Sequence, residues 1–204
     1  MTTTVRGSGP ADHRLFGELR TLVDAVDAAA YDAVVDTATP HLDRLLVRAS
    51  NAANYSRLWL VTAAVLAAGD GAAGRRAACR GLLAISLASA VTNLGLKPLT
   101  RRRRPAPSDG RPVADSRHVR RPESTSFPSG HAASAFAFAS AAGQAAPGVR
   151  LPLHVAAATV AYSRVHTGVH YPSDVAIGAI VGNLCGLAVR RLAASRIRCH
   201  ETRR

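Results

Sequence analysis

The stretch Ser126-Phe127-Pro128-Ser129-Gly130-His131 leads directly into residues 132–146, an alanine-rich segment without a charged side chain. A serine at this place is a preferred N-cap, and the first amides of a helix have no intrahelical partner. The turn is therefore typical of an anion site at a helix start. Gly130 would let a ligand approach the backbone, and His131 would stand beside the bound anion. The same N-cap is common in proteins without a ligand, so its meaning depends on the rest of the chain.

The uncharged segment also decides the fold class, because it offers no face that suits water. Four further apolar segments occur, at 58–68, 77–96, 151–163 and 175–189. A soluble chain of 204 residues cannot hide several such helices. We therefore predict an all-α helical bundle, an integral membrane protein with about five apolar helices, although several segments are shorter than the about 20 residues of a span. Three glycines at helical spacing predict close helix packing: Gly178, Gly182 and Gly186.

The distribution of charge favours a membrane over a nucleic acid as partner. Apolar residues make up 48% of the chain and the formal net charge is +13, with arginines clustered between apolar blocks and only 4% aromatic residues. A nucleic-acid interface would combine basic residues with interleaved aromatics along one face. Cys79, Cys185 and Cys199 are too far apart for a disulfide framework or a CxxC metal site, and we expect free thiols. The polar start, residues 1–10, lacks the apolar core of a secretory signal, which disfavours an exported soluble enzyme.

Four regions are expected along the chain: a flexible tail (1–11), an amphipathic helical region (12–50), a membrane core (51–192) and a basic C-terminal tail (193–204). The amphipathic region has an apolar stripe at helical spacing, made of Leu15, Leu19, Leu22, Val23, Val26 and Ala30. A second helix after Pro40 would turn Leu42, Leu45 and Leu46 inward. Helices that bind membrane surfaces are usually basic, whereas this region is rich in aspartate. We therefore expect it to pack against the rest of the protein.

Three polar clusters carry the candidate chemistry: Lys97 with Arg104, the turn at 128–131, and the loop at 163–174. Two helices separate the second cluster from the third, so both emerge at the same end of the bundle. This topology brings together Lys97, Arg104, His131, Arg164, His170 and Asp174. Fixed cations and helix amides suit a phosphoryl group, while two histidines offer a nucleophile and an acid. The carboxylate would orient one of them.

These clusters resemble the three-part signature of type 2 phosphatidic acid phosphatases, whose superfamily also contains vanadium haloperoxidases. Six residues separate Lys97 from Arg104-Pro105, the second part is Pro128-Ser129-Gly130-His131, and the third runs from Ser163-Arg164 through His170 to Asp174. All three parts are complete in order and spacing over residues 97–174, which makes the combination far more specific than any single part. Membrane members of the family usually have six helices, and here the amphipathic region could take the place of the sixth.

The resemblance implies a phosphatase that needs no metal or other cofactor and works through a phosphohistidine. His170 would be the nucleophile, with Asp174 orienting its ring. His131 would protonate the leaving alkoxide and later activate water. The phosphoryl oxygens would be held by Lys97, Arg104, Arg164, the Ser129 hydroxyl and the Gly130 amide.

Neighbouring residues of the same types receive other interpretations. Arg101, Arg102 and Arg103 are expected to steer phosphate or to contact headgroups. His166 and His170 have the spacing of a zinc pair, but Gly168 and Pro172 interrupt the helix that such a pair requires. His170 must be neutral to attack and His131 must be protonated to donate. We therefore expect a bell-shaped dependence of activity on pH, with both limbs set by these histidines.

The leading hypothesis is hydrolysis of a lipid phosphate, a phosphomonoester or a diphosphate, at the bilayer by a multi-pass protein of the cell membrane. The bias toward arginine and alanine indicates a bacterial source. Two alternatives remain: a vanadate-dependent haloperoxidase, and a non-enzymatic polybasic protein that binds anionic lipid. The sequence does not distinguish phosphatidic acid, phosphatidylglycerol phosphate and polyprenyl phosphates. It also leaves open whether the first apolar block spans, which side of the membrane the site faces, and the oligomeric state.

Overall fold

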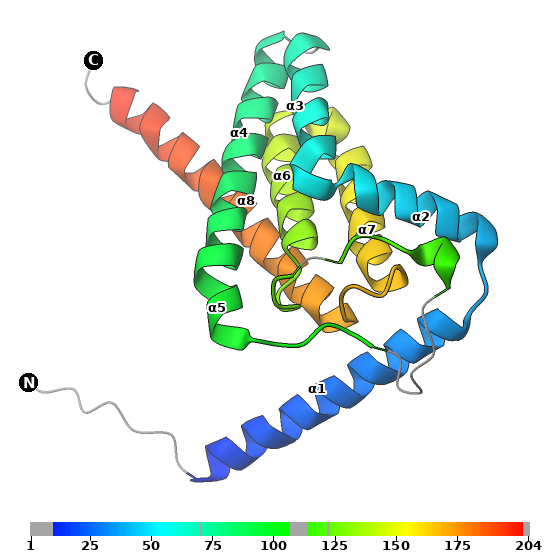
Figure 1. Ribbon diagram of the computed structural model, residues 1–204. Helices are drawn as coiled ribbons and strands as arrows, with labels where there is room; N and C mark the ends of the chain where they lie inside the picture. Colours follow the sequence, from blue (N-terminus) through cyan, green and yellow to red (C-terminus); the bar gives the residue numbers. More distant parts are fainter. Residues whose placement is uncertain (1–9, 70, 107–113, 122, 202–204) are drawn as a thin grey trace, which may run out of the picture.

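The computed structural model describes residues 10–69, 71–106, 114–121 and 123–201. This part of the chain is helical and contains no strand, which confirms the all-α prediction (Figure 1). The helices are α1 (Pro10–Asp36), α2 (Pro40–Ala52), α3 (Arg57–Gly69), α4 (Gly71–Ala90), α5 (Lys97–Thr100), α6 (Gly130–Ala145), α7 (Arg150–His166) and α8 (Pro172–Glu201). A π-helical segment, Val91–Leu96, joins α4 to α5, and short 3-10 turns occur at Asn54–Ser56, Asp115–Arg117 and Pro147–Val149.

Helix α6 is the central element of the bundle. It packs against α4, α7 and α8, and its side chains are buried on nearly every face, including Ala133, Ala137 and Phe138. Three protein helices thus cover this uncharged helix. Alanine makes this possible, since its small side chain lets neighbouring helices approach from all sides. The exposed apolar side chains belong to the outer helices, with Val61 and Val65 on α3, Leu83 on α4, and Ile180 and Leu184 on α8.

The contact between α6 and α8 depends on the three glycines singled out in the sequence. A Cβ atom at Gly178 would lie 2.5 Å from the carbonyl oxygen of Ser129, and one at Gly182 would lie 2.3 Å from that of Ala133. At Gly186 it would lie 2.7 Å from the Ser140 Cβ atom. These positions have no room for a side chain, which confirms the predicted close packing. The contact at Gly178 also sets the distance between α8 and the turn that begins α6.

We expect Gly178→Ala to destabilise the protein by about 1–3 kcal/mol, as overpacking does elsewhere, and to reduce turnover. The added methyl group pushes the start of α8, which carries Asp174, away from Ser129. Thermal unfolding in detergent and phosphate release measure the two effects. Gly17→Ala is the matched control, since a Cβ there meets nothing within 4 Å. Equal stability and activity of the two variants would contradict this account.

Helices α1 and α2 lie outside the bundle, and α1 crosses the end that carries the polar loops (Figure 1). Their predicted inward faces were largely wrong. On α1 the apolar stripe is exposed, with Leu15, Leu22 and Val26 more than half accessible. Of the three leucines expected to face inward on α2, only Leu46 is buried, while Leu42 and Leu45 are exposed. The face of α1 that meets the protein instead carries Asp24, Asp27 and Tyr31, because the two aspartates pair with a partly buried arginine described below.

A buried polar cluster holds α2 against α7. The carboxylate of Asp43 accepts hydrogen bonds from Arg117 Nε (2.9 Å), His166 Nε2 (2.7 Å) and Ser116 Oγ (2.7 Å). Burial alone would raise the pKa of Asp43, but these hydrogen bonds outweigh it and lower the pKa to about 2. The loop between α5 and α6 is thereby fixed at its midpoint, around Arg117.

Two helical stretches are long and apolar enough to cross a membrane, Gly71–Thr100 and Pro172–Ser195. The remaining apolar helices are shorter than the length of a span, as the sequence indicated. Helix α8 continues without a break to Glu201, so residues 193–201 prolong the last helix instead of forming a separate tail. At the other end α1 already begins at Pro10, and residues 1–9 of the predicted flexible tail lie outside the described residues.

Candidate active site

The loops at one end of the bundle enclose a cavity of about 310 Å³. We call it the catalytic cavity. Five of the predicted site residues line it: Lys97, Arg104, Gly130, His131 and His170. The three other predicted residues, Ser129, Arg164 and Asp174, are buried around it and do not line it. The three sequence clusters therefore meet at one place, as the topology predicted.

His170 lies in the short connection between α7 and α8. Gly168 there has a left-handed backbone (φ 69°), and Pro172 begins α8. The ring is buried, with Nδ1 3.6 Å from Asp174 Oδ2 and 3.4 Å from Ser126 Oγ. The opposite nitrogen, Nε2, lies 3.3 Å from Arg104 Nη1. With a proton on Nδ1 facing the carboxylate, the Nε2 lone pair points to the arginine that would hold a phosphoryl oxygen.

The surroundings of His170 keep its ring neutral. Burial is the main cause, and the charges of Arg104 and Arg164 act in the same direction, whereas the hydrogen bond to Asp174 opposes them. The net effect lowers the pKa of His170 to about 4. A neutral imidazole at physiological pH is the form that a nucleophile requires.

The pKa of His170 predicts an acid limb of activity near pH 4, below the ordinary value of histidine. Protonation blocks attack, so activity is lost as the pH falls through this value and is retained above it. The measurement is kcat/KM against pH, corrected for the second ionisation of the substrate phosphate, which lies near pH 6. Arg104→Gln should move the limb upward because it removes a charge that lowers the pKa, while Arg103→Gln, at an exposed position, should not. A limb at the ordinary histidine value in all three proteins would contradict the prediction.

Asp174 is fully buried at the start of α8 and is held by three donors. Its Oδ2 accepts hydrogen bonds from the Ser126 hydroxyl and from the Tyr171 amide (2.9 Å), and its Oδ1 accepts one from Arg102 Nη1 (2.9 Å). The carboxylate therefore has little freedom to turn away from His170.

Arg102 connects this carboxylate to α1. Its Nη2 lies 2.7 Å from both Asp24 Oδ1 and Asp27 Oδ2, and its Nη1 also donates to Ser173 Oγ (2.7 Å). The guanidinium stacks over the Tyr171 ring at 4.5 Å. The expectation that Arg102 steers phosphate or contacts headgroups was wrong, because its guanidinium forms ion pairs with neighbouring carboxylates. The sequence held no signal for this role, since Asp24 and Asp27 are distant in the chain.

Arg102→Ala should lower kcat by roughly ten- to a hundredfold, the effect of a lost charged hydrogen bond of about 1.5–3 kcal/mol, and leave KM unchanged. Arg102 positions Asp174 and does not line the catalytic cavity, so substrate affinity should not change. Steady-state kinetics measure the separate effects on kcat and KM. The control is Arg103→Ala, which removes the same charge at the adjacent position. A raised KM with unchanged kcat would instead indicate a headgroup contact.

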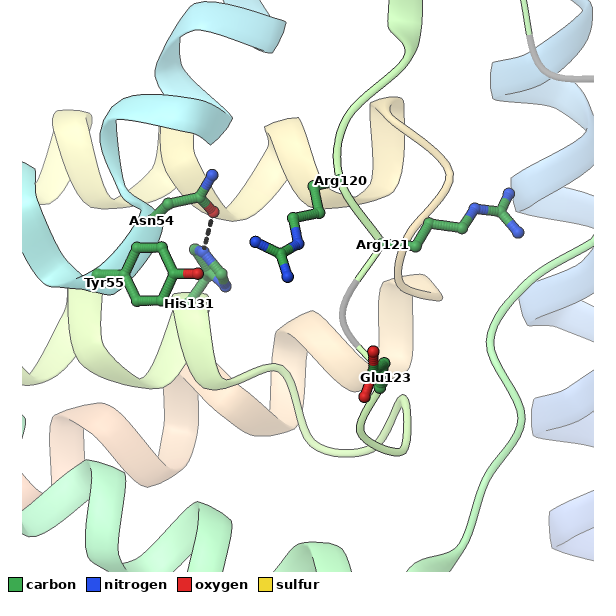
Figure 2. Close-up of a pocket in the computed structure, with 6 residues that line it drawn as sticks. All are labelled: Asn54, Tyr55, Arg120, Arg121, Glu123 and His131. Carbon is green, nitrogen blue, oxygen red and sulfur yellow. Dashed lines mark hydrogen bonds between the residues drawn. The ribbon is translucent and has the colours of Figure 1, made fainter.

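His131, at the start of α6, is held by Asn54. Its Nε2 lies 3.0 Å from Asn54 Oδ1 and donates to that amide oxygen (Figure 2), so the proton for the leaving group would be a second one, on Nδ1 of the imidazolium. Burial and the charges of Arg164 and other nearby cations lower the pKa of His131 to about 2, and the negative charge of a bound phosphate opposes this shift. Asn54 was not singled out in the sequence. It belongs to the turn between α2 and α3, far from the three clusters, and no motif marks it.

Arg164 lies in the last turn of α7 and is 1% exposed. Its Nη1 donates to the Ser50 hydroxyl, whereas Nε and Nη2 are buried without a protein partner. Buried guanidinium donors without partners are costly in a protein, and an anion satisfies them. Lys97 Nζ donates to Ser124 Oγ (3.2 Å), and Arg104 Nη2 donates to the same oxygen (3.3 Å). Ser129 acts as the N-cap of α6, since its Oγ accepts the Ala132 amide hydrogen.

The donor set suits an anion better than a metal ion. Among the described residues, no group of three or more histidine, cysteine or acidic side chains could hold a metal. His166 is bound to Asp43 and is therefore not paired with His170. The sequence argument against a zinc pair is consistent with this placement.

Comparisons with known proteins identify a family and a fold. The sequence profile of the PAP2 superfamily matches residues 77–198. The decaprenylphosphoryl-5-phosphoribose phosphatase of Mycobacterium tuberculosis is 41% identical over 106 residues, 52% of this chain and 56% of the relative. The lipid A 4'-phosphatase of Bacteroides thetaiotaomicron is 35% identical over 109 residues, 51% of this chain and 48% of the relative. The match thus spans about half the length of these curated relatives.

Two crystal structures share the fold. LpxE of Aquifex aeolicus superimposes with a TM-score of 0.64 at 23% identity, covering 80% of this chain and 93% of LpxE. The first transmembrane PAP2 type phosphatidylglycerolphosphate phosphatase from Bacillus subtilis gives 0.66 at 24% identity, with 85% and 87% covered. Both cover much more of the chain than the sequence matches do.

Proposed function

Because this chain belongs to the PAP2 superfamily, we propose that it is a membrane phosphatase that hydrolyses a lipid phosphate through a phosphohistidine intermediate, without a metal. One observation carries the proposal: His131 and His170 line the same cavity as Lys97 and Arg104. Two histidines and two cations in one cavity supply what phosphoryl transfer needs, which is a nucleophile, an acid and charge stabilisation.

The reaction would proceed in two displacements. Nε2 of His170 attacks phosphorus, the bond to the lipid oxygen breaks, and His131 donates a proton to that oxygen. Water then attacks the phosphohistidine while His131 takes its proton, and phosphate leaves with His170 restored. Lys97, Arg104 and Arg164 would stabilise the phosphoryl oxygens in both transition states, together with the Ser129 hydroxyl and the Gly130 amide.

Exposed apolar side chains next to the site support a lipid as substrate. Leu94 and Leu99 flank Lys97 on the segment that joins α4 and α5, and they are 80% and 81% exposed. A lipid lying against this segment could place its phosphate at Lys97 while its chains stay in the bilayer. The names of the relatives, all phosphatases, favour this reading over a haloperoxidase or a non-enzymatic lipid-binding protein.

We place the protein in a bacterial cell membrane as a multi-pass protein, with residues 51–192 as its phosphatase core. The two candidate spans, Gly71–Thr100 and Pro172–Ser195, support the membrane location. Both curated relatives are bacterial.

Phosphate release from a panel of lipids tests the proposal. Phosphatidic acid, phosphatidylglycerol phosphate and a polyprenyl phosphate would be presented in mixed micelles to the full chain, with and without a chelator of divalent ions. We expect release from at least one lipid, unchanged by the chelator. Inhibition by chelator that a divalent ion reverses would contradict the metal-free mechanism. Halide oxidation with added vanadate and no phosphate release would favour the haloperoxidase.

A further inference from the structure

A second cavity of about 370 Å³ adjoins the catalytic cavity. Its lining is Asn54, Tyr55, Arg120, Arg121, Glu123 and His131, shown in Figure 2. We call it the headgroup cavity. It shares Tyr55 and His131 with the catalytic cavity, but His170, Lys97 and Arg104 do not line it. The two cavities therefore meet at the proposed acid, and the proposed nucleophile and phosphate-binding cations are confined to one of them.

The direction of phosphoryl transfer assigns a part of the substrate to this second cavity. In an in-line displacement the nucleophile and the leaving oxygen lie on opposite sides of phosphorus. His170 marks the nucleophile side, and the acid that protonates the leaving oxygen, His131, marks the other. The atoms beyond that oxygen must continue past His131, which is where the headgroup cavity begins.

Polar and charged side chains contribute to the lining of the headgroup cavity, and one of them is a cation without a partner among the described residues. In Figure 2 the guanidinium of Arg120 extends into the space beside Asn54 and His131, whereas that of Arg121 extends away from it toward α1. No hydrogen bond or ion pair engages Arg120 among the residues that the structure describes. Asn54 and Glu123 add groups that accept hydrogen bonds from hydroxyls. A neutral, wholly apolar leaving group would gain nothing from these groups.

Tyr55 lines both cavities and has an unusual backbone conformation. Tyr55 and Ser56 have φ angles of 54° and 57°, the left-handed region that such residues seldom adopt, and the Tyr55 side chain is 74% exposed. Strained residues of this kind concentrate at ligand sites. The strain keeps an aromatic ring in water at the junction, where it can pack against a bound headgroup.

We propose that the headgroup cavity binds the leaving-group part of the substrate and that Arg120 pairs with a second anionic group there. The preferred substrate is then a lipid phosphate whose alcohol carries its own negative charge, such as a phosphodiester, and hydroxyl groups. This inference rests on the proposed phosphatase function and narrows its substrate class. Arg120 acts as a specificity residue and takes no part in bond breaking.

Two lipids with the same acyl chains test the proposal. Phosphatidic acid releases a neutral diacylglycerol, whereas phosphatidylglycerol phosphate releases a lipid that keeps an anionic phosphodiester. We expect the full chain in mixed micelles to prefer phosphatidylglycerol phosphate by at least about tenfold in kcat/KM. Arg120→Ala should lower kcat/KM for this lipid by roughly ten- to a hundredfold, the effect of one charged hydrogen bond, and leave phosphatidic acid unchanged. Arg103→Ala removes the same charge at an exposed position that lines neither cavity, and it should preserve the preference.

The possible outcomes separate this inference from the function on which it rests. Equal losses for both lipids in Arg120→Ala, or equal effects of Arg120→Ala and Arg103→Ala, would overturn the headgroup cavity and leave the phosphatase intact. Equal use of both lipids by the unmodified protein would do the same. Absence of phosphate release from both lipids and from p-nitrophenyl phosphate, a soluble phosphomonoester, would overturn the proposed function and this inference with it.

Discussion

His170→Ala should abolish phosphate release, with kcat falling by about 10⁴-fold or more, while the protein remains folded. The size of the loss is that of removing a nucleophile from a set of residues that act together. The imidazole is buried and in contact with Arg104 and Asp174, whereas His131, which lines the same cavity, is held by Asn54. Alanine leaves a small polar space near the surface of the bundle end, which water can fill, so the fold should persist.

The experiment combines turnover with trapping of the intermediate. Labelled substrate is quenched in alkali, where phosphohistidine is stable, and label on the protein is counted for the unmodified chain and for His170→Ala. His154→Ala serves as control, because His154 lies on α7 and bonds only to the Arg150 carbonyl among the described contacts. Label on His170→Ala, or turnover close to that of His154→Ala, would exclude His170 as the nucleophile.

His131→Ala should lower kcat by about 10²–10⁴-fold for lipid substrates, the range for loss of a general acid. The reason is that an alkoxide leaves poorly without a proton, and the Asn54 contact aims the ring nitrogen that would supply it. The loss should shrink for p-nitrophenyl phosphate, whose leaving group needs no proton. Formation of the phosphoenzyme from this substrate should therefore be nearly normal in a single turnover.

The second step provides a further check on His131. Since His131 also activates water, the variant should accumulate phosphoenzyme from p-nitrophenyl phosphate and release phosphate slowly. Asn54→Ala should show a weaker form of the same pattern, because it removes only the support of the ring. A variant that loses phosphoenzyme formation equally with both leaving groups would place His131 among the phosphate-binding residues instead.

The sequence predicted the helical bundle and the meeting of the three clusters because both depend on local patterns. Apolar blocks, prolines and the Ser129 N-cap mark helix boundaries, and the parity of the crossings decides which loops share an end. The positions of the helices along the sequence were therefore enough to predict that His131 and His170 lie at the same end of the bundle. The neighbours that cover α6 could not be predicted, since apolar composition does not tell whether a neighbour is protein or lipid.

The supporting residues could not be predicted, since each depends on a contact between distant parts of the chain. Asn54 reaches His131 from the turn after α2, and Ser50 meets Arg164 from α2 itself. The predicted orientation of α1 was wrong for a related reason. A hydrophobic stripe suggests a buried face, but the ion pairs of Asp24 and Asp27 with Arg102 turn the opposite face toward the protein.

The alanine-rich interior of α6 has a consequence for conformational entropy. Burying a long side chain such as methionine or lysine costs about 1.5–2 kcal/mol of rotamer freedom, whereas alanine and glycine have almost none to lose. The central helix is thus immobilised by its neighbours at a small entropic cost. Its first turn, which contributes Gly130 and His131 to the catalytic cavity, can stay rigid without long side chains to anchor it.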